Sequence, residues 1–353
     1  MKTEIVKVED VHTEKEEQAL QRAGTLLREG GLVVFPTETV YGLGADARDA
    51  DAAKKIYAAK GRPSDNPLIV HVATPDEAER YAILPSIYWR LAKEFMPGPL
   101  TVIMPVKESI PSTVTAGLST VAIRCPSHPV ARALLAASGV PIAAPSANLS
   151  GSPSPTCAAH VIDDMDGRVD MIIDGGDCDI GVESTIVKIE ADETLTLLRP
   201  GAITREMLES VAGELKIAEA VLGALPEGAA VLSPGMKYRH YAPRAPLYLL
   251  DGTTEQITDY IKQQAGRVAV LCYDEEKPIF NTFLKAECCF SFGERKNRSQ
   301  QAKRLFFLLR EIDKLDFDAI FAPLPPTDDI GMALYNRMIR AAAHHIVYLR
   351  EGM

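Results

Sequence analysis

Two side chains with fixed positive charge, Lys60 and Arg62, lie two residues apart, and the polar side chain of Asn66 follows them. Gly61 and Pro63 disfavour a continuing helix, so both cations can reach one ligand from an irregular loop. An anion with several charged oxygens, such as a substrate rich in phosphate, is the partner that this pattern favours. An isolated Lys-x-Arg pair is more often a solvated basic turn, so the rest of the chain has to decide between these interpretations.

Other polar side chains lie at the ends of short apolar, β-branched runs, which predict strands. The runs cover residues 32–35, 68–72, 100–105, 140–144 and 171–174. Thr37, His71, Ser146 and Asn148 lie at or just after such ends. Open α/β sheets place their ligands at the ends of strands, which supports a binding function for these residues. A helix over residues 51–60 is expected to deliver Lys60 to its loop.

Three of these features have a structural alternative. Arg124 ends an apolar strand, and a buried arginine there needs an anion, which can be a carboxylate of a ligand or of a structural salt bridge. A lone histidine in a strand, such as His71, is more often structural than functional. The loop over residues 146–156, rich in small hydroxyl and amide side chains, can cradle phosphate oxygens or serve as a surface linker.

Residues 42–47, Gly-Leu-Gly-Ala-Asp-Ala, match the G-x-G-x-x-A pattern of dinucleotide-binding loops. In that motif the glycines follow a strand directly and open a helix. Here a polar Thr-Glu-Thr segment intervenes, and the helical pattern begins only near Asp51. We therefore expect no nicotinamide or flavin site.

The composition describes a globular protein with two domains. The 353 residues exceed what one hydrophobic core usually organises, and 46% of them are hydrophobic. The sequence has no apolar run near the roughly 20 residues that cross a bilayer and no signal-peptide pattern, so we expect a cytoplasmic protein without membrane contact. Its six cysteines show no C-x-x-C spacing, which favours free thiols over zinc ligands. The net charge of −10 argues against nucleic-acid binding over the whole surface, although a local basic groove is compatible with it.

After residue 246, strands and helices are predicted to alternate. Apolar runs at 247–250, 268–271 and 319–321 separate helical patterns at 254–264, 299–314 and 330–344. Such alternation is typical of a small parallel α/β domain.

Six motifs, taken together and in this order, resemble the YrdC-type catalytic domain. They are Pro36–Gly44, Lys60-x-Arg62, Asn66–His71, Ser146-x-Asn148, Gly181–Ile186 and Leu198–Gly201. The segment Ser233–Pro243 is similar to the linker of two-domain L-threonylcarbamoyladenylate synthases and is the most specific single match. The resemblance implies an α/β protein, in which a twisted open mixed sheet of YrdC type precedes a smaller Rossmann-like parallel α/β domain. The corresponding boundaries are 1–215 for the catalytic domain, 216–246 for the linker and 247–353 for the second domain.

The resemblance also implies a reaction. L-Threonine, bicarbonate or CO2, and ATP condense to L-threonylcarbamoyl-AMP, pyrophosphate leaves, and a downstream transferase passes the threonylcarbamoyl group to adenosine in tRNA. Charge builds on phosphate oxygens and no covalent enzyme nucleophile is needed, so positioning and electrostatics carry such a reaction. Mg2+ is expected to arrive with ATP, no tightly bound organic cofactor is expected, and direct contact with tRNA is not required.

Roles follow from the resemblance residue by residue. Lys60 and Arg62 are the expected catalytic residues. The expected ATP contacts are Lys60, Arg62, Asn66, Thr120, Ser146, Asn148, Ser154, Arg199 and Tyr238. The expected L-threonine contacts are Thr37, His71, Arg124 and Ser184, with Arg124 on the carboxylate. The metal ligands stay unknown, although Glu38 and Glu183 lie in suitable motifs, and residues 233–243 are expected to close over the site as a lid.

Two other functions fit parts of the sequence. An RNA-binding module of the same fold could present a basic concave face, but the acidic total charge argues against it. Carbamoyl transfer from carbamoyl phosphate uses a similar domain beside zinc-finger modules, and this chain has no C-x-x-C pairs. Both alternatives are therefore weaker than adenylate synthesis.

Overall fold

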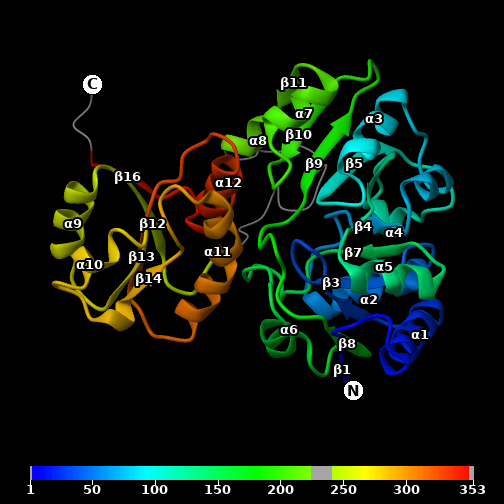
Figure 1. Cartoon of the computed structure of the whole chain (residues 1–353), viewed down its shortest axis with the longest axis horizontal. Coiled ribbons are helices and arrows are strands. Elements are labelled where there is room, and N and C mark those ends of the chain that lie inside the picture. Colours follow the sequence, from blue (N-terminus) through cyan, green and yellow to red (C-terminus); the bar gives the residue numbers. More distant parts are fainter. Residues whose placement is uncertain (1, 224–240, 350–353) are drawn as a thin grey trace. The chain divides into compact units, whose positions relative to one another are not determined.

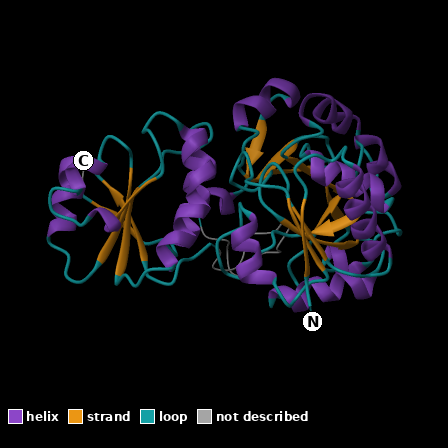
Figure 2. Cartoon of the chain, turned by 60° about the horizontal axis from the view of Figure 1, so that its bottom comes forward, coloured by secondary structure: helices purple, strands orange, loops and turns teal. Residues whose placement is uncertain are grey.

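The computed structural model describes residues 2–223 and 241–349. The chain forms two compact units, one of residues 1–150 with 154–237 and one of residues 151–153 with 238–353. In both, helices flank a sheet (Figures 1 and 2). The expected ATP contact Tyr238 and most of the proposed lid over 233–243 lie outside the described residues.

The first unit is built on an eleven-stranded sheet with the order β1-β8-β2-β3-β7-β4-β6-β5-β9-β10-β11. Its strands are β1 (Glu4–Lys7), β2 (Val33–Phe35), β3 (Gly42–Asp46), β4 (Ile69–His71), β5 (Leu100–Pro105), β6 (Thr120–Arg124), β7 (Ile142–Ala144), β8 (Met171–Asp174), β9 (Thr185–Ile189), β10 (Leu195–Arg199) and β11 (Leu215–Ile217). Its helices are α1 (Glu14–Arg28), α2 (Ala50–Lys60), η1 (Pro75–Arg80), α3 (Ser86–Phe95), α4 (Ser112–Thr115), α5 (Pro129–Ser138), α6 (Ala158–Met165), α7 (Arg205–Ala212) and α8 (Glu219–Leu222). Parallel and antiparallel pairs both occur, which confirms the expected mixed sheet.

Helix α2 explains how Lys60 reaches the site. Asp49 caps its first turn by accepting the backbone N–H of Asp51 (2.8 Å). Its inner face is apolar, and Lys60 lies on that buried face in the last turn. Gly61 then ends the helix with φ of 62°, a left-handed conformation that suits glycine. The capping signals at both ends therefore bury a cation at the C-terminus of a helix, where its charge is favourable.

Strand β3 contains the Gly-Leu-Gly pattern and lies inside the sheet between β2 and β7. A Cβ at Gly44 would lie 2.6 Å from Cγ2 of Ile142 and 2.9 Å from Cε1 of Phe35. Gly44 is thus required by close packing of side chains over the strand. Because these residues form an interior strand, they cannot form the turn of a dinucleotide-binding loop.

One face of the sheet near β2 and β8 is closed by α1 and α5. Leu27 of α1 and Leu134 of α5 are fully buried in one cluster with Phe35 and Ile173. Burial of such side chains is worth about 1.5–3 kcal/mol each relative to exposure. This core fixes the part of the sheet from which the loop after β2 extends.

The second unit has a parallel sheet of five strands with the order β14-β13-β15-β12-β16. Its strands are β12 (Leu247–Asp251), β13 (Val268–Cys272), β14 (Cys289–Ser291), β15 (Ala319–Pro323) and β16 (Ile346–Tyr348). Its helices are α9 (Thr254–Lys262), α10 (Lys277–Phe280), η2 (Ala286–Cys288), α11 (Arg298–Asp313) and α12 (Gly331–Ala341). Helices α9 and α10 lie on one side of the sheet, and α11 and α12 lie on the other (Figure 1). The expected parallel α/β domain is confirmed, with the short strands β14 and β16 as additions.

Among the described residues, none of the helices combines the length and the apolar character needed to span a membrane.

Candidate functional site

Register across the sheet brings several of the expected side chains into one row. His71 of β4 pairs with Arg124 of β6, and Arg124 pairs with Thr101 of β5. The row extends through Ile142 on one side and through Ile186 and Arg199 on the other. Directly paired residues share a face of the sheet, and neighbouring strands are about 4.8 Å apart. These six residues, called the His71 row below, therefore share one face of the sheet, and four of them, His71, Arg124, Thr101 and Arg199, are polar.

A second group lies toward the other end of the same strands. Lys60 donates to the backbone carbonyls of Ser146 and Asn148 at 2.5 Å each and approaches Oδ1 of Asn148 at 3.4 Å. Arg62 donates to the backbone carbonyls of Asn66 (3.3 Å) and Pro67 (3.1 Å). Tyr57 of α2 donates to the carbonyl of Asn66 at 3.2 Å, which ties the loop after α2 back to that helix. The residues Lys60, Arg62, Asn66, Ser146 and Asn148 are called the Ser146 cluster below.

The register shows how far apart the two groups lie. Ile69 pairs with Ala144 and Ala122, two residues along from the His71 row. Thr120 lies four residues from Arg124 on β6, which is roughly 13 Å at about 3.3 Å per residue. Thr120, an expected ATP contact, is thus at the far end of β6 from the His71 row. The expected substrate contacts therefore lie at both ends of the same strands.

An apolar patch separates the two polar groups. Ile69, Ala122 and Ile103 belong to one cluster of buried side chains. Ile69, Ala122 and Ile103 pair with one another across β4, β6 and β5, so they share the face of the His71 row. The site surface therefore offers charge and hydrogen bonds at both ends and an apolar floor between them.

Arg124 forms a buried ion pair with Glu38, a residue for which the sequence suggested only a metal-binding role. Nη2 of Arg124 donates to Oε1 of Glu38 at 2.7 Å, and the two side chains are 4% and 8% exposed. Oε2 of Glu38 accepts the backbone N–H groups of Ser127 (3.2 Å) and His128 (3.4 Å) before α5. Nε of Arg124 is buried and has no hydrogen-bond partner among the residues that the structure describes. A buried donor without a partner is costly, which marks this atom as a point for a ligand acceptor.

Glu38 is held in its charged form. Burial by itself raises the pKa of a carboxyl group, but the charge of Arg124, its hydrogen bond and the backbone N–H of Ser127 together hold the pKa of Glu38 below its usual value. Both carboxylate oxygens are engaged, so Glu38 is a poor candidate for a metal ligand.

His71 is buried, and its geometry defines its tautomer. Nδ1 lies 3.2 Å from the carbonyl oxygen of Ile69 and 3.3 Å from that of Ile142. Only a protonated Nδ1 can donate to these carbonyls, so Nε2 carries the lone pair and can accept a hydrogen bond. Burial, followed by the charge of Arg124, lowers the pKa of His71 to about 3. His71 is therefore a neutral acceptor at physiological pH.

The depressed pKa of His71 predicts an acid-sensitive fold. Between pH 6.5 and about 3, His71 is protonated in the unfolded chain but stays neutral in the folded chain. Through this residue, the free energy of unfolding therefore falls by about 1.4 kcal/mol for each pH unit as the pH decreases. In the variant His71→Asn, which cannot titrate, urea unfolding between pH 6 and 4.5 should show a correspondingly shallower loss. If the free energy of unfolding fell equally steeply with pH in both proteins, the lowered pKa of His71 would be contradicted.

Ser184 and Arg199 meet at the far side of the His71 row. Arg199 donates from Nε to the carbonyl of Ser184 (3.0 Å) and from Nη2 to its Oγ (3.1 Å). The Ser184 hydroxyl also bonds the fully buried Thr101 hydroxyl at 2.7 Å. Gly201 lets the chain approach closely, because a Cβ there would lie 2.6 Å from the backbone nitrogen of Thr185. Sequence reasoning missed Thr101, since a threonine in the middle of an apolar strand carries no signal of its own.

The remaining expected residues are buried in their own loops. Oγ1 of Thr37 donates to the carbonyl of Val40 (2.6 Å) and accepts the backbone N–H of Thr39 (3.2 Å). Ser154 is fully buried and donates to Oε1 of Glu183 at 2.6 Å. In the described part of the chain, no group of three or more His, Cys, Asp or Glu side chains is arranged to hold a metal ion.

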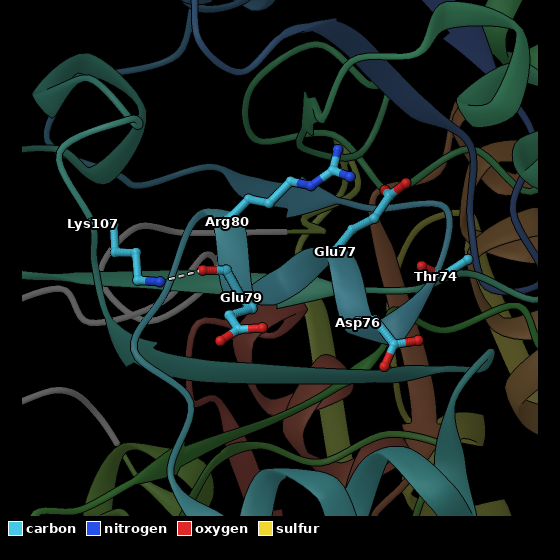
Figure 3. A pocket seen from close by; sticks show the side chains of 6 residues that line it. All are labelled: Thr74, Asp76, Glu77, Glu79, Arg80 and Lys107. Atoms are coloured by element: carbon cyan, nitrogen blue, oxygen red, sulfur yellow. Dashed lines mark hydrogen bonds between the residues drawn. The ribbon is translucent and has the colours of Figure 1, made fainter.

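A separate pocket of about 560 Å3 lies on η1 and next to the end of β5 (Figure 3). Its lining residues are Thr74, Asp76, Glu77, Glu79, Arg80 and Lys107, and Lys107 donates to the backbone carbonyl of Glu79. Mixed charges line it and none of the expected substrate contacts does. It is therefore distinct from the candidate site.

Family models, curated sequences and a solved structure all relate this chain to threonylcarbamoyl-AMP synthases. Residues 25–201 match the Sua5/YciO/YrdC family model, described as telomere recombination, and residues 203–343 match the model described as threonylcarbamoyl-AMP synthase, C-terminal domain. The chain is 47% identical over 333 residues to a threonylcarbamoyl-AMP synthase of Bacillus subtilis, covering 93% of this chain and 94% of that one. It is 42% identical over 340 residues to the one of Pyrococcus abyssi, covering 94% and 96%. The crystal structure of P. abyssi Sua5 complexed with L-threonine superposes with a TM-score of 0.88 at 40% identity, covering 98% and 99%.

Proposed function

The chain belongs to the threonylcarbamoyl-AMP synthase family, and we propose that the two polar groups on its sheet hold the two substrates which the family's reaction joins. The protein makes L-threonylcarbamoyl-AMP from L-threonine, bicarbonate or CO2, and ATP, with release of pyrophosphate. It is a nucleotidyltransferase of tRNA threonylcarbamoyladenosine biosynthesis.

L-Threonine is proposed to bind at the His71 row. Arg124 would take the carboxylate, because its buried Nε has no acceptor among residues 2–223 and 241–349, and this single observation is the main support for the proposal. The neutral Nε2 of His71 would accept a hydrogen bond from the amino acid, and the hydroxyls of Thr37 and Ser184 lie in the motifs expected beside it. A relative of the same length binds L-threonine in its crystal structure, which supports a site of this kind.

ATP is proposed to place its phosphates at the Ser146 cluster. Lys60 and Arg62 supply positive charge there, and Asn66, Ser146, Asn148 and Ser154 supply hydrogen-bonding groups. Arg199 lies on the His71 row, so its proposed phosphate contact would be the one nearest the amino acid. Thr120 and Tyr238 remain proposed as further ATP contacts.

The reaction needs positioning more than covalent chemistry. The threonine amine attacks CO2 and loses a proton, which gives a carbamate. A carbamate oxygen then attacks the α-phosphorus, and the bond to the pyrophosphate oxygen breaks. Charge grows on phosphate oxygens in this step, and fixed cations such as Lys60 and Arg62 stabilise it without reorganisation. Mg2+ bound to the phosphates would supply further charge neutralisation.

The domain boundaries, the lid and the location in the cell are further proposals. The catalytic part would end near residue 215, a linker over 216–246 would close the site as a lid, and residues 247–353 would form a separate domain. A cytoplasmic location suits an enzyme that consumes ATP and delivers its product to a tRNA threonylcarbamoyl transferase. Direct contact with tRNA is not required for the reaction.

The proposal predicts that pyrophosphate release from ATP requires both L-threonine and bicarbonate. Omission of either should reduce the rate to background, because the carbamate forms only when both are present. The measurement is a coupled pyrophosphate assay with D-threonine as the matched control for the amino acid. Release that continued without L-threonine would contradict the proposed function.

A further inference from the structure

The loop after β2 contains a carboxylate that neither a substrate contact nor a metal site explains. Glu38 follows the expected threonine contact Thr37, is buried, and bonds both Arg124 and the backbone before α5. Removing a charge of this kind from water is expensive unless its partners are well arranged. The burial of Glu38 therefore suggests that this carboxylate has a role outside its own loop.

Glu38 belongs to a hydrogen-bond network that links the start of α5 to Arg124. The backbone N–H groups of Ser127 and His128 hold Oε2 at the start of α5, where the helix also favours a negative charge. Oε1 then holds Nη2 of Arg124 at 2.7 Å. Because a guanidinium is planar and rigid, holding one of its nitrogens sets the direction of the others. Nε, which has no partner in the described part of the chain, is thereby kept in one orientation.

We propose that Glu38 is a positioning residue, which orients the guanidinium of Arg124 so that Arg124 receives the substrate carboxylate in one fixed geometry. The inference rests on the proposed binding of L-threonine by Arg124. Glu38 itself touches no substrate. Its negative charge competes little with the substrate, because two backbone N–H groups as well as Arg124 already share it.

The variant Glu38→Gln tests this role with little change in shape. A glutamine amide offers one oxygen where the carboxylate offers two, so either Arg124 or the backbone near Ser127 meets an N–H group instead of an acceptor. The KM for L-threonine should rise about 10-fold to 100-fold, by analogy with the effect of groups that orient metal-ligating side chains. The KM for ATP should change less than twofold. Glu77→Gln is the matched control, because Glu77 lies at the pocket of Figure 3 and accepts the backbone N–H of Ala73 at 3.1 Å.

A double-mutant cycle separates positioning from a merely structural effect. In the background of Arg124→Lys, Glu38→Gln should raise the KM for L-threonine no further, because the oriented group is already gone. L-Threonine amide, which lacks the carboxylate, should inhibit the Glu38→Gln variant as well as it inhibits the wild type. If Glu38→Gln does not fold, Glu38→Asp, which keeps the charge but is shorter, carries the same comparison.

Several results would overturn the inference. Equal increases in the KM of both substrates would mean that Glu38 only supports the fold. Effects of Glu38→Gln and Arg124→Lys that multiply would mean that the two residues act independently, and a lower KM for L-threonine would mean that Glu38 competes with the substrate. If Arg124→Lys by itself left L-threonine use unchanged, the proposed carboxylate contact would fail first, and the inference about Glu38 with it.

Discussion

Replacement of Arg124 by alanine is expected to lower kcat/KM for L-threonine by about 30-fold to several thousand-fold, which corresponds to roughly 2–5 kcal/mol. The side chain is 4% exposed and is the only proposed contact with a full positive charge for the carboxylate. The KM for ATP should change much less, because the proposed phosphate contacts lie at the Ser146 cluster. Pyrophosphate release at varied concentrations of each substrate measures both quantities.

The Arg124→Ala variant also leaves Glu38 as a buried charge without its cation, which costs about 3–5 kcal/mol of folding stability. Arg124→Lys is therefore the variant to compare at equal folded fraction, since it keeps the charge and loses the planar fork. Arg132→Ala, an exposed arginine on α5, is the control. An Arg124 variant that is folded and still uses L-threonine normally would refute the proposed contact.

Replacement of Lys60 by methionine is expected to reduce kcat/KM for ATP by about 100-fold to 1000-fold, as loss of a group that stabilises transition-state charge does in other enzymes. The variant keeps the length of the side chain but removes the ammonium that donates to the carbonyls of Ser146 and Asn148. Because these buried carbonyls then lose their hydrogen-bond donor, the free energy of unfolding should also fall by about 1–3 kcal/mol.

Lys54→Met provides the control for this prediction. Lys54 lies on the same helix, its side chain is 66% exposed, and it pairs only weakly with Asp51 at the surface. Its activity and stability should therefore match the wild type. If Lys60→Met lost the use of L-threonine and ATP to the same extent, Lys60 would serve the loop as a scaffold and would not hold the nucleotide.

Local patterns in the sequence predicted many elements of the fold. The β-branched runs became β2, β4, β5, β7 and β8, and the regular alternation after residue 246 became a parallel sheet flanked by helices. Strand β3 was not predicted, because its two glycines have low strand propensity. What places glycine there is contact with Phe35 and Ile142, which belong to other strands. That information is not contained in the segment itself.

The candidate site divides in a similar way. Residue types and spacing pointed to Lys60, Arg62, His71 and Arg124, since fixed charges and a histidine at strand ends carry a signal of their own. Thr101 carried no such signal, and Glu38 was noticed only as a carboxylate in a suitable motif. Their roles depend on partners 83 and 86 residues away, Ser184 and Arg124, with which they form buried hydrogen bonds.

The sequence by itself thus determined which chemical groups the protein brings to its site, the family's reaction that they suit, and the local elements that present them. Only the tertiary structure decided that His71, Arg124, Thr101 and Arg199 share one row, and that Lys60 meets Ser146 toward the other end of the strands. The physical reason is that strand order and register depend on which distant segments pack together. Residues far apart in sequence, such as Lys60 and Ser146, thereby become neighbours.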